Sequence, residues 1–319
     1  MARPSKRRRQ DVPADGSTPS RPPGSPRPAP STPSRYRTQR VEVPRPWWQN
    51  PWAWSGGVIV VVVAVVVVFI VLGMRPAAKS TSSSSSSLAP ASVLAAVTGV
   101  SPTVSSSIGG GGVTNPLEAV SGSPAALTGP DAKPEVLYYG ADFCPYCAAE
   151  RWSLVVALSR FGTFSNLHTT TSSSSDVYPN TNTFSFYGSS YSSPYLDFAS
   201  VEAADRSDNP LQTPTAAEQA VFTTYDTSPY STSTGGIPFL DLGNRYIASG
   251  SGVPPQVLQG LSWEQIATTL TDATSTVAQP IIGNANWVTA GICKLTGNQP
   301  GSVCSAGPIA SLESQLGSS

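Results

Sequence analysis

Histidine and cysteine are scarce in this sequence. Among 319 residues there is one histidine, His168, and there are four cysteines. Two of them form a C-x-x-C motif at Cys144 and Cys147, and the others, Cys293 and Cys304, have ten residues between them. Neither a second C-x-x-C nor an H-x-x-x-H motif is present to complete a tetrahedral zinc site. Zinc is therefore the less favoured interpretation of the C-x-x-C motif, and we expect no metal and no cofactor.

Charged residues are also few, at 12% of the chain, and the two signs are separated along it. Residues 1–50 contain eleven of the nineteen Lys and Arg residues but only three of the nineteen acidic residues. This segment carries a net charge of +8, and the remainder, with eight basic and sixteen acidic side chains, carries −8. Two halves of opposite charge indicate two different environments.

A run of nineteen residues without charge, 56–74, separates these halves. A helix of that length spans roughly 28 Å, which matches the hydrocarbon core of a bilayer. Trp47, Trp48, Trp52 and Trp54 precede the run, where an aromatic belt would lie at the membrane interface. A helix of a soluble protein would show a polar face, which this run lacks, and a cleaved signal peptide would have a shorter leader. We therefore expect a transmembrane helix over 53–74.

The basic residues lie almost entirely before this helix, which by the positive-inside rule places the N-terminus in the cytoplasm. The expected protein is a single-pass protein of the cell membrane with an extracytoplasmic C-terminal domain. Residues 1–52 are rich in Pro, Arg and Ser, and we expect a disordered cytoplasmic tail. Its basic cluster at 6–9 could contact anionic lipid or nucleic acid, but a role in topology is favoured and no nucleic acid partner is expected.

The segment after the membrane divides into a Ser/Gly-rich linker, 75–115, and a folded domain, 116–319. Apolar residues at Val93, Leu94 and Val97 interrupt the linker and could form a short helix that docks on the domain. Within the domain we expect an α/β fold. Strands are expected at 135–139, 167–171, 184–187 and 195–201, with a hairpin of 237–242 and 245–248 around Gly243-Asn244. Helices are expected at 145–161, from a capping box at 215–218 to Tyr225, and from another at 262–265 to about Thr271.

The clearest chemical signal is Cys144-Pro145-Tyr146-Cys147, directly after an apolar strand and in the first turn of an apolar helix. The first sulfur there faces the unpaired amides and positive end of the helix, which favour thiolate over thiol. Pro145 suits the first helical position because its missing N–H would have no partner there. We expect Cys144 to be the nucleophile and Cys147 the resolving thiol. A structural disulfide without redox turnover is the alternative.

Other residues are candidates with less specific signals. Cys293 and Cys304 bracket a turn-rich loop, and outside the cell we expect them to form a structural disulfide, a second redox pair being less favoured. The aromatic residues between Tyr178 and Phe198 could line a peptide groove, although packing in the core is favoured. His168 has no candidate acid or nucleophile nearby and is interpreted as structural or solvated.

A second segment supports a redox domain. Gly235-Gly236-Ile237-Pro238 precedes an apolar strand, and X-Pro is the bond type that can be cis. The order of these segments resembles that of the thioredoxin superfamily. A strand, the C-x-x-C motif and a helix come first, and Ile-Pro follows before a hairpin and another helix. The resemblance implies that Pro238 packs beside the disulfide, that the Ile237 backbone and Tyr146 face substrate, and that an insertion lies between the C-x-x-C helix and the Pro238 strand. Phe143 occupies the position at which thioredoxin has Trp. No clear counterpart of the buried acid of thioredoxin is found, because Asp142 is near the motif in sequence only.

More of the chain resembles a narrower family, domain of unknown function 929. The resemblance covers roughly 117–316 and includes the segments YYGADFCPYCAAERWSLVVALSRFGTF, DVYPNT, TFSFYGSSY and YLDF. It supports the fold without implying an activity. The sequence thus predicts a membrane-anchored thiol–disulfide oxidoreductase that acts on exported proteins or on a membrane redox partner. The alternative is a non-catalytic thioredoxin-like binding or structural domain.

Overall fold

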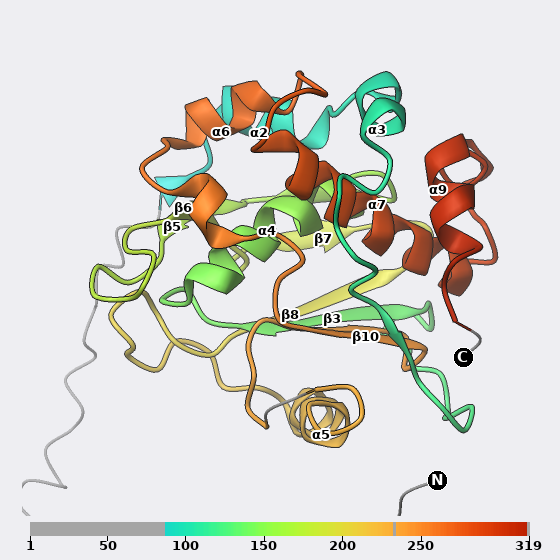
Figure 1. Cartoon of the computed structure of the whole chain (residues 1–319). Coiled ribbons are helices and arrows are strands. Elements are labelled where there is room, and N and C mark those ends of the chain that lie inside the picture. The colour runs from blue at the N-terminus through green and yellow to red at the C-terminus, as the bar shows by residue number, and fades with distance from the viewer. Residues whose placement is uncertain (1–86, 232–233, 318–319) are drawn as a thin grey trace, which may run out of the picture. The chain divides into compact units, whose positions relative to one another are not determined.

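A five-stranded sheet runs through the part of the chain that the computed structural model describes, residues 87–231 and 234–317 (Figure 1). Its strand order is β2-β10-β9-β3-β8. The central strand β3 (Glu135–Gly140) pairs in parallel with β8 (Asp197–Glu202) and antiparallel with β9 (Phe239–Leu242). Strand β10 (Tyr246–Ser249) forms a hairpin with β9, and β2 (Glu118–Ala119) adds the edge. The expected α/β class is confirmed.

Strand β3 lies inside the sheet, between β9 and β8, and apolar side chains occupy both of its faces. Val136 and Tyr138 belong to the large core, whereas Tyr139 lies in a smaller apolar cluster with Phe239 and Ile247. Alternation of side chains along a strand places these two sets on opposite faces of the sheet. The sheet therefore separates a large core from a small one.

Helices cover the two faces unequally (Figure 1). The helix α4 (Pro145–Leu158) and the long helix α7 (Ala278–Leu295) pack together on the side of the large core. The helix α5 (Ala216–Tyr225) covers the other face, where Phe222 stacks on Tyr139 with ring centroids 4.1 Å apart. The α4 N-terminus lies directly after β3, so the sheet fixes the start of this helix.

The segment expected as a linker is folded from Ser87 onward. It contains β1 (Ser87–Leu88), α2 (Ala91–Thr98) and α3 (Pro102–Ile108). Val93 and Val97, one helical turn apart on α2, are buried in the large core, so the short docked helix expected here is confirmed. The boundary at residue 116 needs correction, because this apolar face completes the core.

The segment between α4 and β8 forms two small sheets. Strand β5 (His168–Thr171) lies between β1 and β6 (Asn182–Ser185), and β4 (Thr163–Ser165) pairs with β7 (Ser190–Ser192). The expected strands 184–187 and 195–201 correspond to β6 and β8, but they belong to different sheets. Strand β7 lies between them in the sequence, and β8 pairs with β3.

Other expected boundaries hold closely. Both capping boxes are present, at the start of α5 and of α6 (Trp263–Thr269). The hairpin turn is formed by Gly243 and Asn244, both with positive φ. Helix α4 ends at Leu158 rather than 161, because the amides of Arg160 and Phe161 bond to carbonyls three residues back and tighten the last turn.

The C-terminal part closes the large core. A 3-10 helix η2 (Pro255–Leu258) precedes α6, and the short helices α8 (Gly301–Cys304) and α9 (Gly307–Glu313) follow α7. Cys293 of α7 and Cys304 of α8 form the expected disulfide, which ties these elements together.

The expected tail 1–52, the expected membrane helix 53–74 and residues 75–86 lie outside the described residues. Within the described ranges, a test of length and apolarity finds no single helix suited to cross a membrane. The pair α2 and α3, bent by 60°, satisfies that test only when the two are taken together.

Candidate functional site at the start of helix α4

The C-x-x-C motif begins helix α4. Cys144 is the N-cap, with extended backbone angles of φ −76° and ψ 122°, and Pro145 occupies the first helical position. The Cys144 Sγ accepts a hydrogen bond from the Cys147 backbone N–H at 3.3 Å. The sulfur thus takes the place of the side-chain oxygen that usually caps a helix, facing amides without helical partners.

The two thiols have different surroundings. Both are free, but Cys144 retains 6% of its exposure whereas Cys147 has none. The hydrogen bond from the Cys147 side chain, followed by backbone amides and the charge of Arg151, lowers the pKa of Cys144 against the opposing effect of burial. Burial, followed by the hydrogen bond to and charge of Cys144, raises the pKa of Cys147 well above its ordinary value. Cys144 is therefore suited to be the thiolate and Cys147 to hold the proton.

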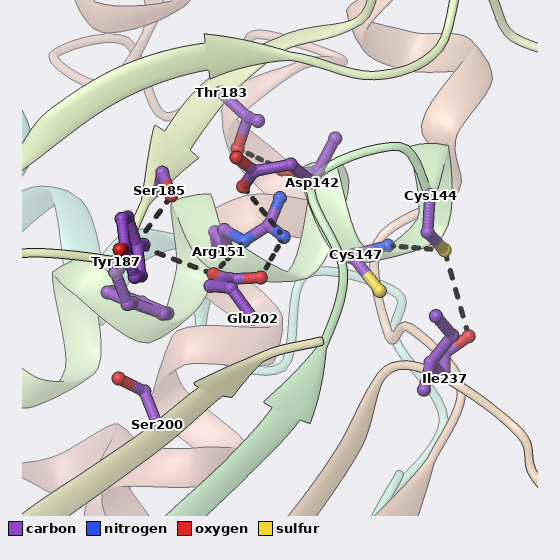
Figure 2. A network of polar contacts seen from close by, with 12 residues as sticks. Asp142, Cys144, Cys147, Arg151, Thr183, Ser185, Tyr187, Ser200, Glu202 and Ile237 are labelled. Carbon is purple, nitrogen blue, oxygen red and sulfur yellow. Dashed lines mark hydrogen bonds and ion pairs between the residues drawn. The ribbon is translucent and has the colours of Figure 1, made fainter. Parts of the chain in front are cut away.

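Ile237 approaches Cys144 from the start of β9. The Cys144 thiol donates to the Ile237 carbonyl oxygen at 3.8 Å, as Figure 2 shows, and the Ile237–Pro238 bond is cis. The preceding amides of Gly235 and Gly236 both donate to Asp226 Oδ2 at the end of α5. The structure thus brings Cys144 and Ile237 into contact although they are far apart in the sequence. The hydrogen bonds to Asp226 fix the end of the loop between α5 and β9.

A loop of the segment between α4 and β8, residues 172–181, contacts the motif as well. The Ser173 amide donates to the Phe143 carbonyl at 2.8 Å. The ring of Tyr178 meets that of Tyr146 edge to face, with centroids 6.1 Å apart. Tyr146 is 43% exposed beside the buried Cys144. Of the aromatic residues expected to favour the core, Phe184 and Phe186 are buried there, but Tyr178 lies at the motif.

A buried ion cluster lies one helical turn after Cys147. Arg151, fully buried, donates from Nε and Nη2 to the two carboxylate oxygens of Glu202 at 2.8 and 2.5 Å. Its Nη2 also lies 3.5 Å from Asp142 Oδ1, and its guanidinium lies over the Tyr138 ring. Figure 2 shows Arg151 between the two carboxylates, with Cys147 nearby.

The cluster has unusual protonation equilibria. Burial raises the pKa of Glu202 to about 7 and raises that of Asp142, while the guanidinium of Arg151 opposes both shifts. Burial also raises the pKa of Tyr138 well above its ordinary value. Gly140 permits this arrangement, since a Cβ there would lie 2.2 Å from the Tyr138 hydroxyl.

Sequence reasoning did not find Arg151, Glu202 or Tyr138. The spacing of four between Cys147 and Arg151 could have indicated a shared helix face. Nothing local marks Glu202, which reaches the cluster because β8 pairs with β3 and sets Glu202 beside Gly140. Asp142, noted only for its nearness in sequence, is buried in the cluster.

The remaining candidates lie elsewhere. Cys293 and Cys304 are bonded to each other, so they take no part in the Cys144 site. His168 lies in β5, partly buried. Among residues 87–231 and 234–317, no group of three or more His, Cys, Asp or Glu side chains is arranged to hold a metal ion.

Comparison with known proteins yields one match. The model of the family described as "Domain of unknown function (DUF929)" matches residues 120–294, which is more than half of the chain, and the chain belongs to this family. The match contains the motif, the ion cluster and the Ile237–Pro238 segment. Neither a curated protein nor a solved structure matches the sequence.

Proposed function

We propose that this DUF929 protein is a thiol–disulfide oxidoreductase with a thioredoxin-like domain, in which Cys144 is the nucleophile and Cys147 the resolving thiol. The strand order supports the thioredoxin-like assignment. The motif strand β3 lies between a parallel strand and an antiparallel hairpin, with α4 and α7 on one face and α5 on the other. In this assignment residues 159–196 are the insertion, lying between α4 and β8.

The proposed reaction is an exchange of disulfides. The Cys144 thiolate attacks one sulfur of a substrate disulfide, whose S–S bond breaks, and the other substrate sulfur leaves as a thiolate and takes up a proton. Cys147 then loses its proton and attacks Cys144 Sγ, releasing the second substrate thiol. The substrate is reduced and the protein holds a Cys144–Cys147 disulfide. The same steps in reverse oxidise a dithiol substrate.

The observation that carries this proposal is the opposite environment of the two thiols. A structural disulfide needs no difference between its sulfurs, whereas exchange needs one accessible, acidic thiol and one protected thiol. Here the hydrogen bond from the Cys147 side chain, together with the N-cap amides, lowers the pKa of Cys144, which keeps 6% of its exposure, and full burial raises the pKa of Cys147.

The proposed site also includes a place for substrate. The backbone of Ile237 beside Pro238 and the exposed ring of Tyr146 border Cys144 on the described surface. We assign substrate contacts to Ile237, Pro238 and Tyr146. Exported protein thiols or disulfides, or a membrane redox partner, are the proposed reactants. The apolar run 56–74 supports anchoring in the cell membrane, with the N-terminus cytoplasmic and the domain outside.

The test is the pH dependence of alkylation in the reduced full-length chain, with the modified peptides identified by mass spectrometry. We expect Cys144 to react rapidly well below pH 8 while Cys147 stays protected. The Cys144→Ser variant should lose turnover of a dithiol–disulfide peptide. The Cys147→Ser variant should still form the mixed disulfide, because only the resolving step is removed.

Slow alkylation of both cysteines, with the profile of an ordinary thiol, would contradict the proposal. So would full turnover by the Cys144→Ser variant. Either result would favour a non-catalytic thioredoxin-like domain in which this cysteine pair is structural.

A further inference from the structure

A second arginine, Arg160, lies just beyond the end of α4 in a setting unlike that of Arg151. Its Nη1 donates to Thr289 Oγ1 at 2.7 Å and its Nη2 to Ser105 Oγ at 3.2 Å. These neutral contacts come from α7 and α3 and use two of the five guanidinium N–H groups. Burial lowers the pKa of Arg160 to about 10, so the group remains a cation at neutral pH.

Arg160 has no carboxylate partner among the described residues. The ion pairs there join Lys133 to Asp131 and Asp197, Arg151 to Asp142 and Glu202, and Lys294 to Glu313. Arg160 is partly buried, and a partly buried cation without a counter-charge is unfavourable to the extent that its lost hydration is not replaced. Arg151, with two carboxylates, shows how the same fold compensates a buried guanidinium.

The Arg160 side chain lines a pocket of about 100 Å³. Hydroxyl-bearing residues Ser105, Ser106 and Ser302 lie on its wall. The rest of the lining is apolar and includes Val303, Ala306 and Ile309. Arg160 is the single charged residue of this lining within the described part of the chain.

We propose that this Arg160 pocket binds a small aliphatic carboxylate. The carboxylate would accept hydrogen bonds from the guanidinium and from the hydroxyls of Ser106 and Ser302, and the short alkyl chain would pack against Val303 and Ile309. A guanidinium presents parallel N–H donors that match the two oxygens of a carboxylate. One cation in an apolar pocket of this volume suits a short monoanion better than a polyanion such as phosphate.

The wall formed by 302–309 lies on both sides of Cys304 in the sequence. The Cys293–Cys304 disulfide ties this wall to α7, which also carries Thr289. The pocket is therefore built from three separated parts of the sequence, α3, the end of α4 and the α7–α9 region, and it is distinct from the Cys144 site.

The test is calorimetric titration of the full-length chain with butyrate, with its neutral amide butyramide, and with inorganic phosphate. We expect butyrate to bind and to raise the thermal unfolding temperature, while butyramide and phosphate bind at least about tenfold more weakly. Equal binding of butyrate and butyramide would overturn the proposal, because the charge of Arg160 would then contribute nothing. Equal binding of phosphate, or no binding of butyrate, would overturn it as well.

Two variants assign the site. Arg160→Gln should weaken butyrate binding at least about tenfold, whereas Arg245→Gln, the same substitution in the hairpin turn outside the pocket, should leave it unchanged. If Arg160→Gln does not fold, Ala306→Trp decides, because it fills the pocket without altering the arginine. Unchanged butyrate binding by Ala306→Trp would place the ligand elsewhere and overturn the proposal.

Discussion

At the scale of single residues, Arg151 connects the stability of the domain with the acidity of Cys144. Replacing it by Met keeps the length of the side chain but leaves Glu202 and Asp142 buried without their cation. We expect the free energy of unfolding to fall by about 3–5 kcal/mol, as for other broken buried ion pairs. We also expect the alkylation profile of Cys144 to move to higher pH, because the charge of Arg151 helps to lower its pKa. Denaturant unfolding and pH-dependent alkylation measure the two effects.

The Arg151→Met/Glu202→Gln double variant is the matched control for this prediction. It removes one of the two orphaned carboxylates, so it should regain part of the lost stability while the Cys144 profile stays shifted. If the pH profile of Cys144 alkylation is unshifted in both variants, the ion cluster stabilises the fold but does not affect the acidity of Cys144.

Asp241 makes stability depend on pH. It is fully buried in β9, where it accepts the Asn244 amide N–H, and burial raises its pKa from 3.8 to about 7. Between these values the native state binds more protons than the unfolded state, so this group makes stability fall as pH rises from about 4 to about 7. We expect Asp241→Asn to leave stability near pH 4 unchanged and to raise it at pH 8, by at most about 4 kcal/mol. Unfolding curves across this range test the prediction.

The control is Asp272→Asn, which replaces an exposed carboxylate. It should not raise the free energy of unfolding at pH 8. An Asp241→Asn protein as unstable as wild type at pH 8 would mean that the buried carboxyl finds compensation in the native state.

At the scale of elements, local patterns predicted most of what the structure contains. Strand β3, the hairpin turn and the capped helices α5 and α6 follow from short sequence signals, since caps and turns need particular residues at fixed positions. Helix α7 was not predicted. It is largely buried on all sides except in its last turn, so it shows no polar face, and no side-chain cap marks its start. The pairing of β4 with β7, and of β5 with β6, was not predicted either. Partners of polar, Ser- and Thr-rich strands are chosen by tertiary contacts.

The disulfide between α7 and α8 should act on stability alone. We expect the Cys293→Ser/Cys304→Ser variant to lose about 2–4 kcal/mol of unfolding free energy, because the unfolded chain is no longer constrained. Its Cys144 alkylation profile should match that of wild type, since this pair lies outside the proposed redox site. Unfolding of the variant is compared with wild type that keeps the Cys293–Cys304 disulfide, and its alkylation is compared with wild type in which Cys144 and Cys147 are reduced. A changed Cys144 profile would instead indicate coupling between the two cysteine pairs.

At the scale of the whole molecule, the order of strands could not be read from the sequence without the family resemblance. Glu202 and Ile237 lie 58 and 93 positions after Cys144, and only the pairing of β8 and β9 with β3 brings them to the motif. The position of the motif itself was predictable, because strand, cysteine pair and helix are consecutive. The site thus divides into a local part that sequence reveals and a supporting part that topology assembles.

The proposed membrane anchoring depends on the apolar run 56–74 before the described domain. We expect the full-length chain to remain with membranes during alkaline extraction. The Val61→Lys/Val65→Lys variant should move to the soluble fraction, because each lysine near the centre of a span costs about 2.5–3.5 kcal/mol. Val41→Lys/Val43→Lys adds the same charges to the basic tail and should stay with membranes. Release of the wild-type chain would contradict the anchor.

The enclosure of Cys144 between the Ile237 carbonyl and the region of the 172–181 loop has a consequence for rates. The Cys144 thiol has a lowered pKa, but with 6% exposure its access to other molecules is sterically restricted. If Cys144 reacts as proposed, we expect its reaction rates to depend on the shape of the attacking molecule as well as on pH, with slender reagents and extended peptide segments reacting faster than folded surfaces. The domain would thereby discriminate among disulfides by the flexibility of the chain around them.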